Sequence, residues 1–179
     1  MKKCSNELIA RMDTDDIAEP NRFELQIKEF EQDKELTLCG GQIAEFADNP
    51  SEITSYRSVP LKHNAILNFA KKRNPFNHMT VMFKKQAVQN VGGYMDMPYF
   101  EDYWLWARML KAGYKAKNIY QVLVKVRAGQ DMIARRGGLN YAKCIIRFEK
   151  ALYNIGIINL AEMIGYITLR CMVSVMPEV

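Results

Sequence analysis

Apolar residues follow strand-like and helix-like spacings in alternation along the first part of the chain. A short apolar run over residues 8–12 stops at an acidic segment, which predicts a buried strand that leads into a loop. Residues 23–33 repeat their apolar positions at helical spacing. Residues 35–48 surround a pair of glycines, which predicts a strand or hairpin with a bulge at the glycines.

The same spacings continue through the middle of the chain and change near residue 139. The elements expected next are a helix over 61–73, a strand over 80–83, helices over 85–91 and 101–112, and strands over 114–119 and 122–126. From Leu139 to Met176 the spacing is that of two long helices with a hinge near Gly156. The pattern therefore predicts an α/β core over residues 1–128 and a C-terminal helical extension over residues 129–179.

Composition narrows the class of protein. Hydrophobic residues make up 49% and charged residues 25% of the 179 positions, as in a globular chain. The sequence has no uncharged apolar stretch of about 18 residues. Arg11 and Asp13 follow its basic opening before an apolar core accumulates, so we expect no export signal. The four cysteines stand far apart, without the paired spacing of a zinc or redox site. We therefore expect a cytoplasmic protein with reduced thiols.

The net charge of +5 is distributed unevenly. Residues 1–52 carry 13 acidic and 6 basic side chains, whereas residues 53–95 carry 7 basic and no acidic side chains. The basic block has few aromatic side chains interleaved with its Lys and Arg, unlike the pattern typical of nucleic-acid binding. We expect no nucleic-acid partner, and acidic small molecules or an anionic membrane surface stay open.

An acidic cluster follows the first expected strand. Alternate residues of an extended segment leave the backbone on the same side, so Asp13 and Asp15 can face one cation. Carboxylate oxygens suit Mg²⁺ or Mn²⁺ that carries phosphate oxygens. The alternative is a turn-forming cluster before the next helix. An EF-hand is excluded, because Ile17 and Ala18 stand where an oxygen ligand and a glycine are needed.

A second pair of carboxylates, Glu101 and Asp102, opens the helix expected over 101–112. Acidic residues in a first turn are favoured by the helix macrodipole, which is one explanation of the pair. The other is catalytic, because a carboxylate in a cleft can accept the proton of an attacking hydroxyl. Trp104 and Trp106 lie on different faces of the helix, so at most one is expected to meet a ligand, and Trp104 is the candidate for stacking on a sugar.

Three further side chains are candidates for substrate binding. His78 lies between a loop and a strand, where it serves either as an ordered hydrogen-bonding residue or in catalysis. Arg135 and Arg136 precede a pair of glycines, and two guanidinium groups can grip a diphosphate in bidentate fashion. A solvated pair of arginines is the equally open alternative.

Four segments, in this order, resemble glycosyltransferase family 2. The first runs from Ile9 to Phe23 and contains Asp13-Thr14-Asp15, which is similar to the metal-binding DxD motif of that family. The others are residues 74–83, residues 92–94 with 101–106, and residues 135–138. Because the segments stay in register over nearly the whole chain, the resemblance is specific. It points to the bacterial enzymes that build capsular or exopolysaccharide repeat units.

The resemblance implies a fold and an activity. The fold is a GT-A sheet, a Rossmann-like arrangement that binds nucleotide-diphosphate sugars, here in partial form. The activity is an inverting transfer of a sugar from such a donor to a hydroxyl of a lipid-linked or oligosaccharide acceptor. The implied roles are metal binding (Mn²⁺ or Mg²⁺) for Asp15, support of the metal or ribose for Asp13, general base for Asp102, orientation of the base or acceptor for Glu101, and diphosphate binding for Arg135 and Arg136.

The resemblance also implies what surrounds this segment. Family members begin with strands that bind the nucleoside, and this sequence is expected to start after them. The strand over residues 8–12 would then expose an unpaired apolar edge, which favours a homodimer. The helices over 139–176 either contact the inner face of the membrane peripherally or pack on the core. The alternative function is a non-catalytic fragment or interaction module of the same fold.

Overall fold

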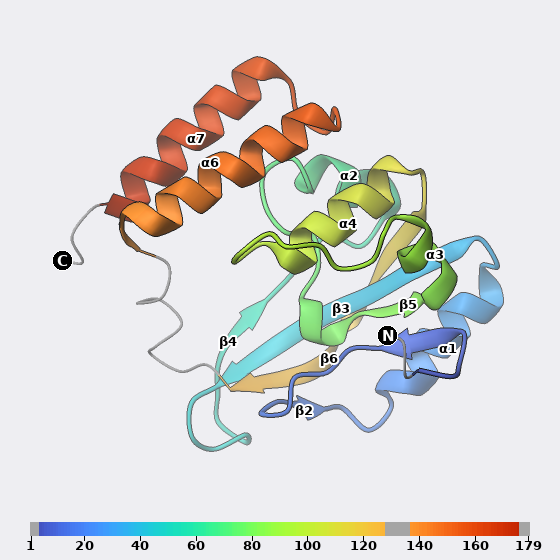
Figure 1. Ribbon diagram of the computed structural model, residues 1–179. Helices are drawn as coiled ribbons and strands as arrows, with labels where there is room; N and C mark the ends of the chain where they lie inside the picture. Colours follow the sequence, from blue (N-terminus) through green and yellow to red (C-terminus); the bar gives the residue numbers. More distant parts are fainter. Residues whose placement is uncertain (1–3, 128–136, 176–179) are drawn as a thin grey trace.

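The structure, a computed structural model, describes residues 4–127 and 137–175 (Figure 1). The elements in chain order are β1 (Leu8–Ala10), β2 (Ile17–Ala18), α1 (Arg22–Gln32), β3 (Leu36–Phe46), β4 (Ile53–Arg57), α2 (His63–Phe69), the 3-10 helix η1 (His78–Thr80), β5 (Met82–Lys84), α3 (Lys85–Asn90), α4 (Glu101–Lys111), β6 (Lys115–Arg127), α6 (Gly138–Asn154) and α7 (Leu160–Val175).

One mixed sheet organises the described chain. Its strands follow the order β1-β5-β3-β6-β2, and β4 pairs with β3. The long strands β3 and β6 are parallel, whereas every other pair is antiparallel. The expected α/β class is confirmed, with strands of mixed direction in the sheet.

Helices cover both faces of this sheet. On one face α2, α3 and α4 pack through a cluster that includes Trp106 and Leu105, both fully buried. On the other face α1 contributes Phe30 to a cluster with Cys39 and Val124. The apolar spacing predicted that α1 is a helix but not which face is buried: Phe23 and Ile27 are 52% and 41% exposed, and Arg22 and Gln26 are buried beside Phe30 instead.

Several elements differ from their expected form. The strands expected over 114–119 and 122–126 are one strand, β6, with an irregularity where Ile119 pairs with Gly41 and Val122 with Gln42. The helix expected over 61–73 is shorter. Strands β2 and β4 were not predicted, because they are short and mostly exposed and lack a clear apolar period.

The strand expected to be buried, β1, lies at the end of the sheet and is only half-buried. It pairs with β5, and its other edge meets no strand within the described residues. An edge strand of this kind can pair with another chain, so the homodimer remains a prediction. None of the helices in the described ranges has the length and apolar character needed to cross a bilayer.

The paired glycines of β3 leave room for side chains of β6. A Cβ on Gly40 would lie 2.4 Å from Oδ1 of Asn118 and 3.0 Å from Phe76. Asn118 in turn donates from Nδ2 to the carbonyl oxygens of Pro60, at 2.7 Å, and Pro75, at 3.0 Å. Gly40 therefore permits the contact through which β6 holds the segment that precedes Asn77.

We expect Gly40→Ala to lower the free energy of unfolding by about 1–3 kcal/mol, because the added methyl group displaces Asn118 from a close-packed position. Denaturant unfolding measures this effect. Gly165→Ala in α7 is the matched control, since its Cβ would meet no heavy atom within 4 Å. That change is expected to be neutral or stabilising. Equal effects of the two substitutions would contradict the packing argument.

The helical extension has one packed helix and one partly covered helix. In α6, Phe148 is fully buried and stacks on Phe100, with ring centroids 4.5 Å apart. Helix α7 packs mainly on α6, as Figure 1 shows, and the chain turns between them at Gly156 with φ of 69°. Packing on the core is thus observed for α6. The expected boundary at residue 128 lies outside the described residues and stays a prediction.

A buried ion pair joins α6, α7 and the segment after α2. Glu149 is 0% exposed, and its Oε1 lies 2.7 Å from Nη1 of Arg170. The Arg170 guanidinium also donates to the carbonyl oxygen of Lys72. Burial raises the pKa of Glu149 to about 6 against the opposing charge of Arg170.

This raised pKa predicts a pH dependence of stability. Between its ordinary pKa of 4.5 and about 6, Glu149 binds a proton in the folded state that the unfolded chain has released. The contribution of Glu149 to the free energy of unfolding is therefore fully present below pH 4.5. It falls by about 2 kcal/mol as the pH rises through 6. The difference in unfolding free energy between wild type and Glu149→Gln should change by that amount. A difference that is constant from pH 4 to pH 7 would contradict it.

Candidate active site

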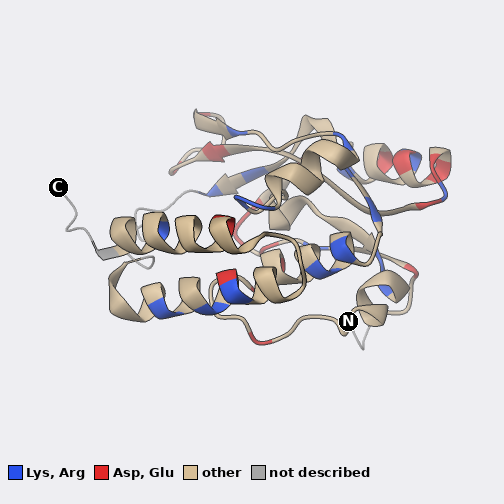
Figure 2. Ribbon diagram, turned by 90° about the horizontal axis from the view of Figure 1, so that it is seen from above, with Lys and Arg blue, Asp and Glu red and all other residues tan. Residues whose placement is uncertain are grey.

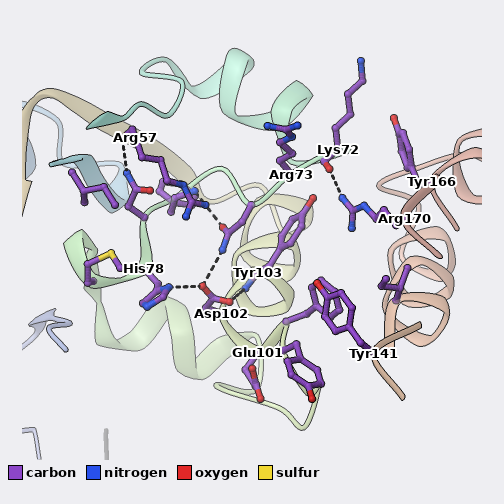
Figure 3. Close-up of a pocket in the computed structure, with 18 of the residues that line it drawn as sticks. Arg57, Lys72, Arg73, His78, Glu101, Asp102, Tyr103, Tyr141, Tyr166 and Arg170 are labelled. Carbon is purple, nitrogen blue, oxygen red and sulfur yellow. Dashed lines mark hydrogen bonds and ion pairs between the residues drawn. The ribbon is translucent and has the colours of Figure 1, made fainter. Parts of the chain in front are cut away.

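A cavity of about 850 Å³ lies between the sheet, the start of α4 and helices α6 and α7 (Figure 3). Its lining includes Asn74 and His78 from the segment after α2, Glu101 and Asp102 from α4, and Tyr141 from α6. Several residues singled out from the sequence therefore meet at one cavity, although they come from distant parts of the chain.

Asp102 is the most strongly held carboxylate of this cavity. Its side chain is 16% exposed. Oδ2 accepts a hydrogen bond from Nδ2 of Asn74 at 2.9 Å, and Oδ1 accepts one from the backbone N–H of Tyr103 at 2.8 Å. These contacts fix the carboxylate at the first turn of α4, where the helix macrodipole also favours a negative charge.

His78 lies between two carboxylates from distant parts of the chain, Asp13 and Asp102. Its Nε2 lies 2.9 Å from Oδ2 of Asp13, and its Nδ1 lies 3.2 Å from Oδ2 of Asp102. With both ring nitrogens protonated, His78 donates to both carboxylates at once. The imidazole therefore connects the acidic loop after β1 with the start of α4.

The pKa values in this group follow from burial and pairing. Burial lowers the pKa of His78, but the hydrogen bond and charge of Asp102 and the hydrogen bond to Asp13 outweigh it and leave the pKa raised. Burial raises the pKa of Asp102, yet its hydrogen bond to His78, the charge of His78 and the Tyr103 N–H leave that pKa lowered. Asp102 is thus kept as a carboxylate with oxygen lone pairs that can accept a proton.

A buried polar network positions the acidic loop. Arg22, which is 1% exposed, donates from Nη2 to the carbonyl oxygen of Arg11 at 2.7 Å and from Nε to Gln26 at 3.1 Å. Gln26 donates to the carbonyl oxygens of Cys39 and Thr80. Helix α1 thereby holds the end of β1 against the centre of the sheet, next to His78.

The two candidate metal ligands have different surroundings. Asp13 is 36% exposed and contacts His78, and Asp15 is exposed two residues further along the loop. The described residues contain no cluster of three or more His, Cys, Asp or Glu side chains that could hold a metal ion. Mg²⁺ and Mn²⁺ sites that carry a nucleotide need only one or two carboxylates, because water and phosphate oxygens supply the rest. The hard oxygen donors of Asp13 and Asp15 therefore fit such an ion.

The other candidates from the sequence lie in different places. Glu101 is exposed and lines the cavity beside Asp102. Trp104 is 9% exposed, packs among apolar residues beneath Arg108, and does not line the cavity. We expected the Trp104 ring to meet a ligand, but it lies away from the cavity, because the side of α4 that carries Trp104 packs against α6. Arg135 and Arg136 lie outside the described residues.

Some residues of the cavity received no role from the sequence. Asn74 holds Asp102, but its partner lies 28 positions away and no local spacing indicates the contact. Tyr99 also lines the cavity and has φ of 68°, which is costly for a residue with a Cβ. Backbone strain of this kind gathers at functional sites, and nothing in the sequence around Tyr99 signals it.

Three related proteins align with nearly the whole length of this chain. An uncharacterised glycosyltransferase of Haemophilus influenzae is 44% identical over 93% of the chain and 62% of its own length. The amylovoran biosynthesis glycosyltransferase AmsE of Erwinia amylovora is 41% identical over 99% and 66%, respectively. A UDP-Gal:alpha-D-GlcNAc-diphosphoundecaprenol beta-1,3-galactosyltransferase of Escherichia coli is 35% identical over 99% and 64%. The chain thus spans somewhat less than two thirds of each relative.

Solved structures share the fold at low sequence identity. Staphylococcus aureus TarS, residues 1–349, in complex with UDP-GlcNAc aligns over 97% of this chain and 51% of its own, with a TM-score of 0.62 and 10% identity. A Pyrobaculum calidifontis mannosyltransferase in complex with GDP-Man and Mn²⁺ aligns over 95% and 46%, with a TM-score of 0.50 and 12% identity. These likenesses confirm the expected GT-A fold.

The family follows from the sequence comparisons. The family model for glycosyl transferase family 2 matches residues 1–95, which include the acidic loop, His78 and most of the sheet. The three relatives named above are glycosyltransferases and cover the remaining elements as well. The resemblance seen in the sequence is therefore confirmed, and the chain belongs to glycosyl transferase family 2.

Proposed function

We propose that this protein transfers a sugar from a nucleotide-diphosphate donor to an acceptor hydroxyl, with inversion at the anomeric carbon, and that Asp102 is the general base. The observation that carries the proposal is the carboxylate of Asp102 in the cavity wall, held by Asn74 and Tyr103 and linked through His78 to Asp13. An oriented, ionised carboxylate can take the proton of a hydroxyl that attacks the sugar.

The chain's own residues take separate roles in this proposal. Asp102 removes the acceptor proton, and Asn74 and His78 hold its carboxylate in one orientation. Glu101, exposed at the cavity beside the base, orients the acceptor hydroxyl. Arg135 and Arg136 would bind the donor diphosphate.

Asp15 and Asp13 would hold Mn²⁺ or Mg²⁺ together with phosphate oxygens of the donor. When bound, the ion offsets the negative charge that develops on the leaving nucleotide diphosphate. Asp13 is paired with His78, which fixes its carboxylate at the site. The exposed Asp15 completes the pair of oxygen ligands from the same loop.

The setting that we propose is the synthesis of a surface polysaccharide, such as a capsule, at the inner face of the membrane. Support comes from two relatives, one named for amylovoran biosynthesis and one for an acceptor linked to diphosphoundecaprenol. The acceptor would accordingly be a sugar linked to a lipid, and the protein a peripheral partner of the bilayer.

A donor screen tests this function. The full-length protein is incubated with UDP-, GDP- and dTDP-sugars, Mn²⁺ and a lipid-linked sugar acceptor, and the released nucleotide diphosphate is measured. We expect release from one donor class that depends on both metal and acceptor. Nucleotide binding without transfer from any donor would favour the alternative of a non-catalytic module.

A further inference from the structure

Two cations lie at one end of the cavity without an ionic partner. Lys72 and Arg73 are exposed, line the cavity, and form no ion pair within residues 4–127 and 137–175. Figure 3 shows them at the end of the cavity opposite Glu101, next to Arg170 of α7. Arg170 is occupied by Glu149 and by the carbonyl oxygen of Lys72, so it fixes the backbone that presents the two cations.

Helix α7 supplies an apolar wall beside these cations. Leu169 and Val173 line the cavity and remain 61% and 63% exposed. Leu160 and Ile164 are also exposed, but helical spacing places them on the opposite side of α7 from Leu169 and Val173. Figure 2 shows α7 almost without colour for charge, because Glu162 and Arg170 are its only charged residues. Exposed apolar side chains in the wall of a cavity, next to unpaired cations, suit an amphiphilic anion better than a free sugar.

We propose that this end of the cavity binds the diphosphate of a lipid-linked acceptor at Lys72 and Arg73, and the first apolar units of its lipid along Leu169 and Val173. The inference rests on the proposed function, since it names the acceptor class of the same cavity. The sugar of such an acceptor would point toward Asp102, which lies in the same cavity wall. Helix α7 would then face the bilayer from which the lipid enters.

The test uses farnesyl diphosphate as a short isoprenoid diphosphate, with inorganic diphosphate and farnesol as its two halves. Calorimetric titration of the full-length protein in EDTA removes any contribution from a metal site. We expect farnesyl diphosphate to bind at least about tenfold more tightly than either half, because only the whole molecule engages both the cations and the apolar wall.

Substitutions separate the two parts of the site. The double substitution Lys72→Ala with Arg73→Ala should lower the affinity for farnesyl diphosphate about tenfold to a hundredfold. The double substitution Leu169→Ser with Val173→Ser should also lower the affinity for farnesyl diphosphate, but it should leave the affinity for inorganic diphosphate unchanged. The matched controls are Lys143→Ala with Lys150→Ala, which are exposed cations of α6 outside the cavity lining, and Ile164→Ser on α7. The affinity of these control variants for farnesyl diphosphate should stay within about twofold of the wild-type value.

The inference would be overturned by equal affinity for farnesyl diphosphate and inorganic diphosphate, by unchanged binding in both double variants, or by displacement of farnesyl diphosphate by UDP in the same EDTA buffer. The last would assign the cations to the donor. Asp102→Asn should bind farnesyl diphosphate like wild type, so the assay reports on this site and not on transfer. Sugar transfer by a protein that fails to bind the probe would refute this inference and leave the proposed function intact.

Discussion

Asp102→Asn in the full-length protein is expected to lower the rate of sugar transfer by about 10²–10⁴-fold while donor affinity stays within about twofold. The asparagine keeps the shape of the side chain and can still accept the hydrogen bond from the Tyr103 N–H, but its amide cannot take the acceptor proton. Initial rates at saturating donor and acceptor, together with calorimetric titration of the nucleotide, separate the chemical step from binding.

Asp48→Asn is the matched control for this substitution, because Asp48 is exposed and lies outside the cavity lining. It should transfer sugar at the wild-type rate. Turnover of Asp102→Asn within about twofold of wild type would remove Asp102 from the mechanism. A parallel loss of nucleotide affinity would instead give the carboxylate a role in donor binding.

Asp15→Ala is expected to abolish the gain in nucleotide affinity that Mn²⁺ provides and to lower transfer by at least about a hundredfold. A divalent ion contributes several kcal/mol at a developing phosphate charge, and Asp15 is one of two carboxylates offered to it. Titration of UDP and GDP with and without Mn²⁺ gives the measurement.

The same variant distinguishes the two explanations of the acidic cluster. Asp15 is exposed in the loop after β1, so its loss should leave the midpoint of thermal unfolding unchanged if its role is metal binding. If the cluster serves only to form the turn, Asp15→Ala should lower that midpoint and leave the metal dependence intact. Asp16, which accepts a hydrogen bond from the backbone N–H of Arg127, provides the comparison, since Asp16→Ala removes a structural contact.

Local spacing predicted the helices of this fold better than its sheet. The apolar periods of α1 and α4 and the glycine between α6 and α7 were enough to place those elements. The pairing of β3 with β6 depends instead on Gly40 and Asn118, which lie far apart in the sequence. The directions of the strands in the sheet depend on such long-range contacts, so the local spacing of apolar residues does not predict them.

The residue types gathered at the candidate site were predictable from the sequence, whereas the contacts among them were not. Acidic residues after a strand and at a helix start indicated Asp13 and Asp102 from local chemistry alone. Their junction through His78 spans 65 positions to Asp13 and required the fold to be known. The burial of Trp104 was not foreseen, because the side of α4 that it occupies packs on α6, an element whose position only the tertiary structure gives.

The anomeric configuration of the product tests the central claim most directly. A single displacement, in which Asp102 activates the acceptor hydroxyl, inverts the configuration of the transferred sugar. Proton NMR of the first product formed by the full-length protein from an α-linked donor should therefore show a β-glycoside, and Asp102→Asn should form none in the same time. An α-glycoside, or wild-type rates in the variant, would contradict the assignment of Asp102 as the base of an inverting transfer.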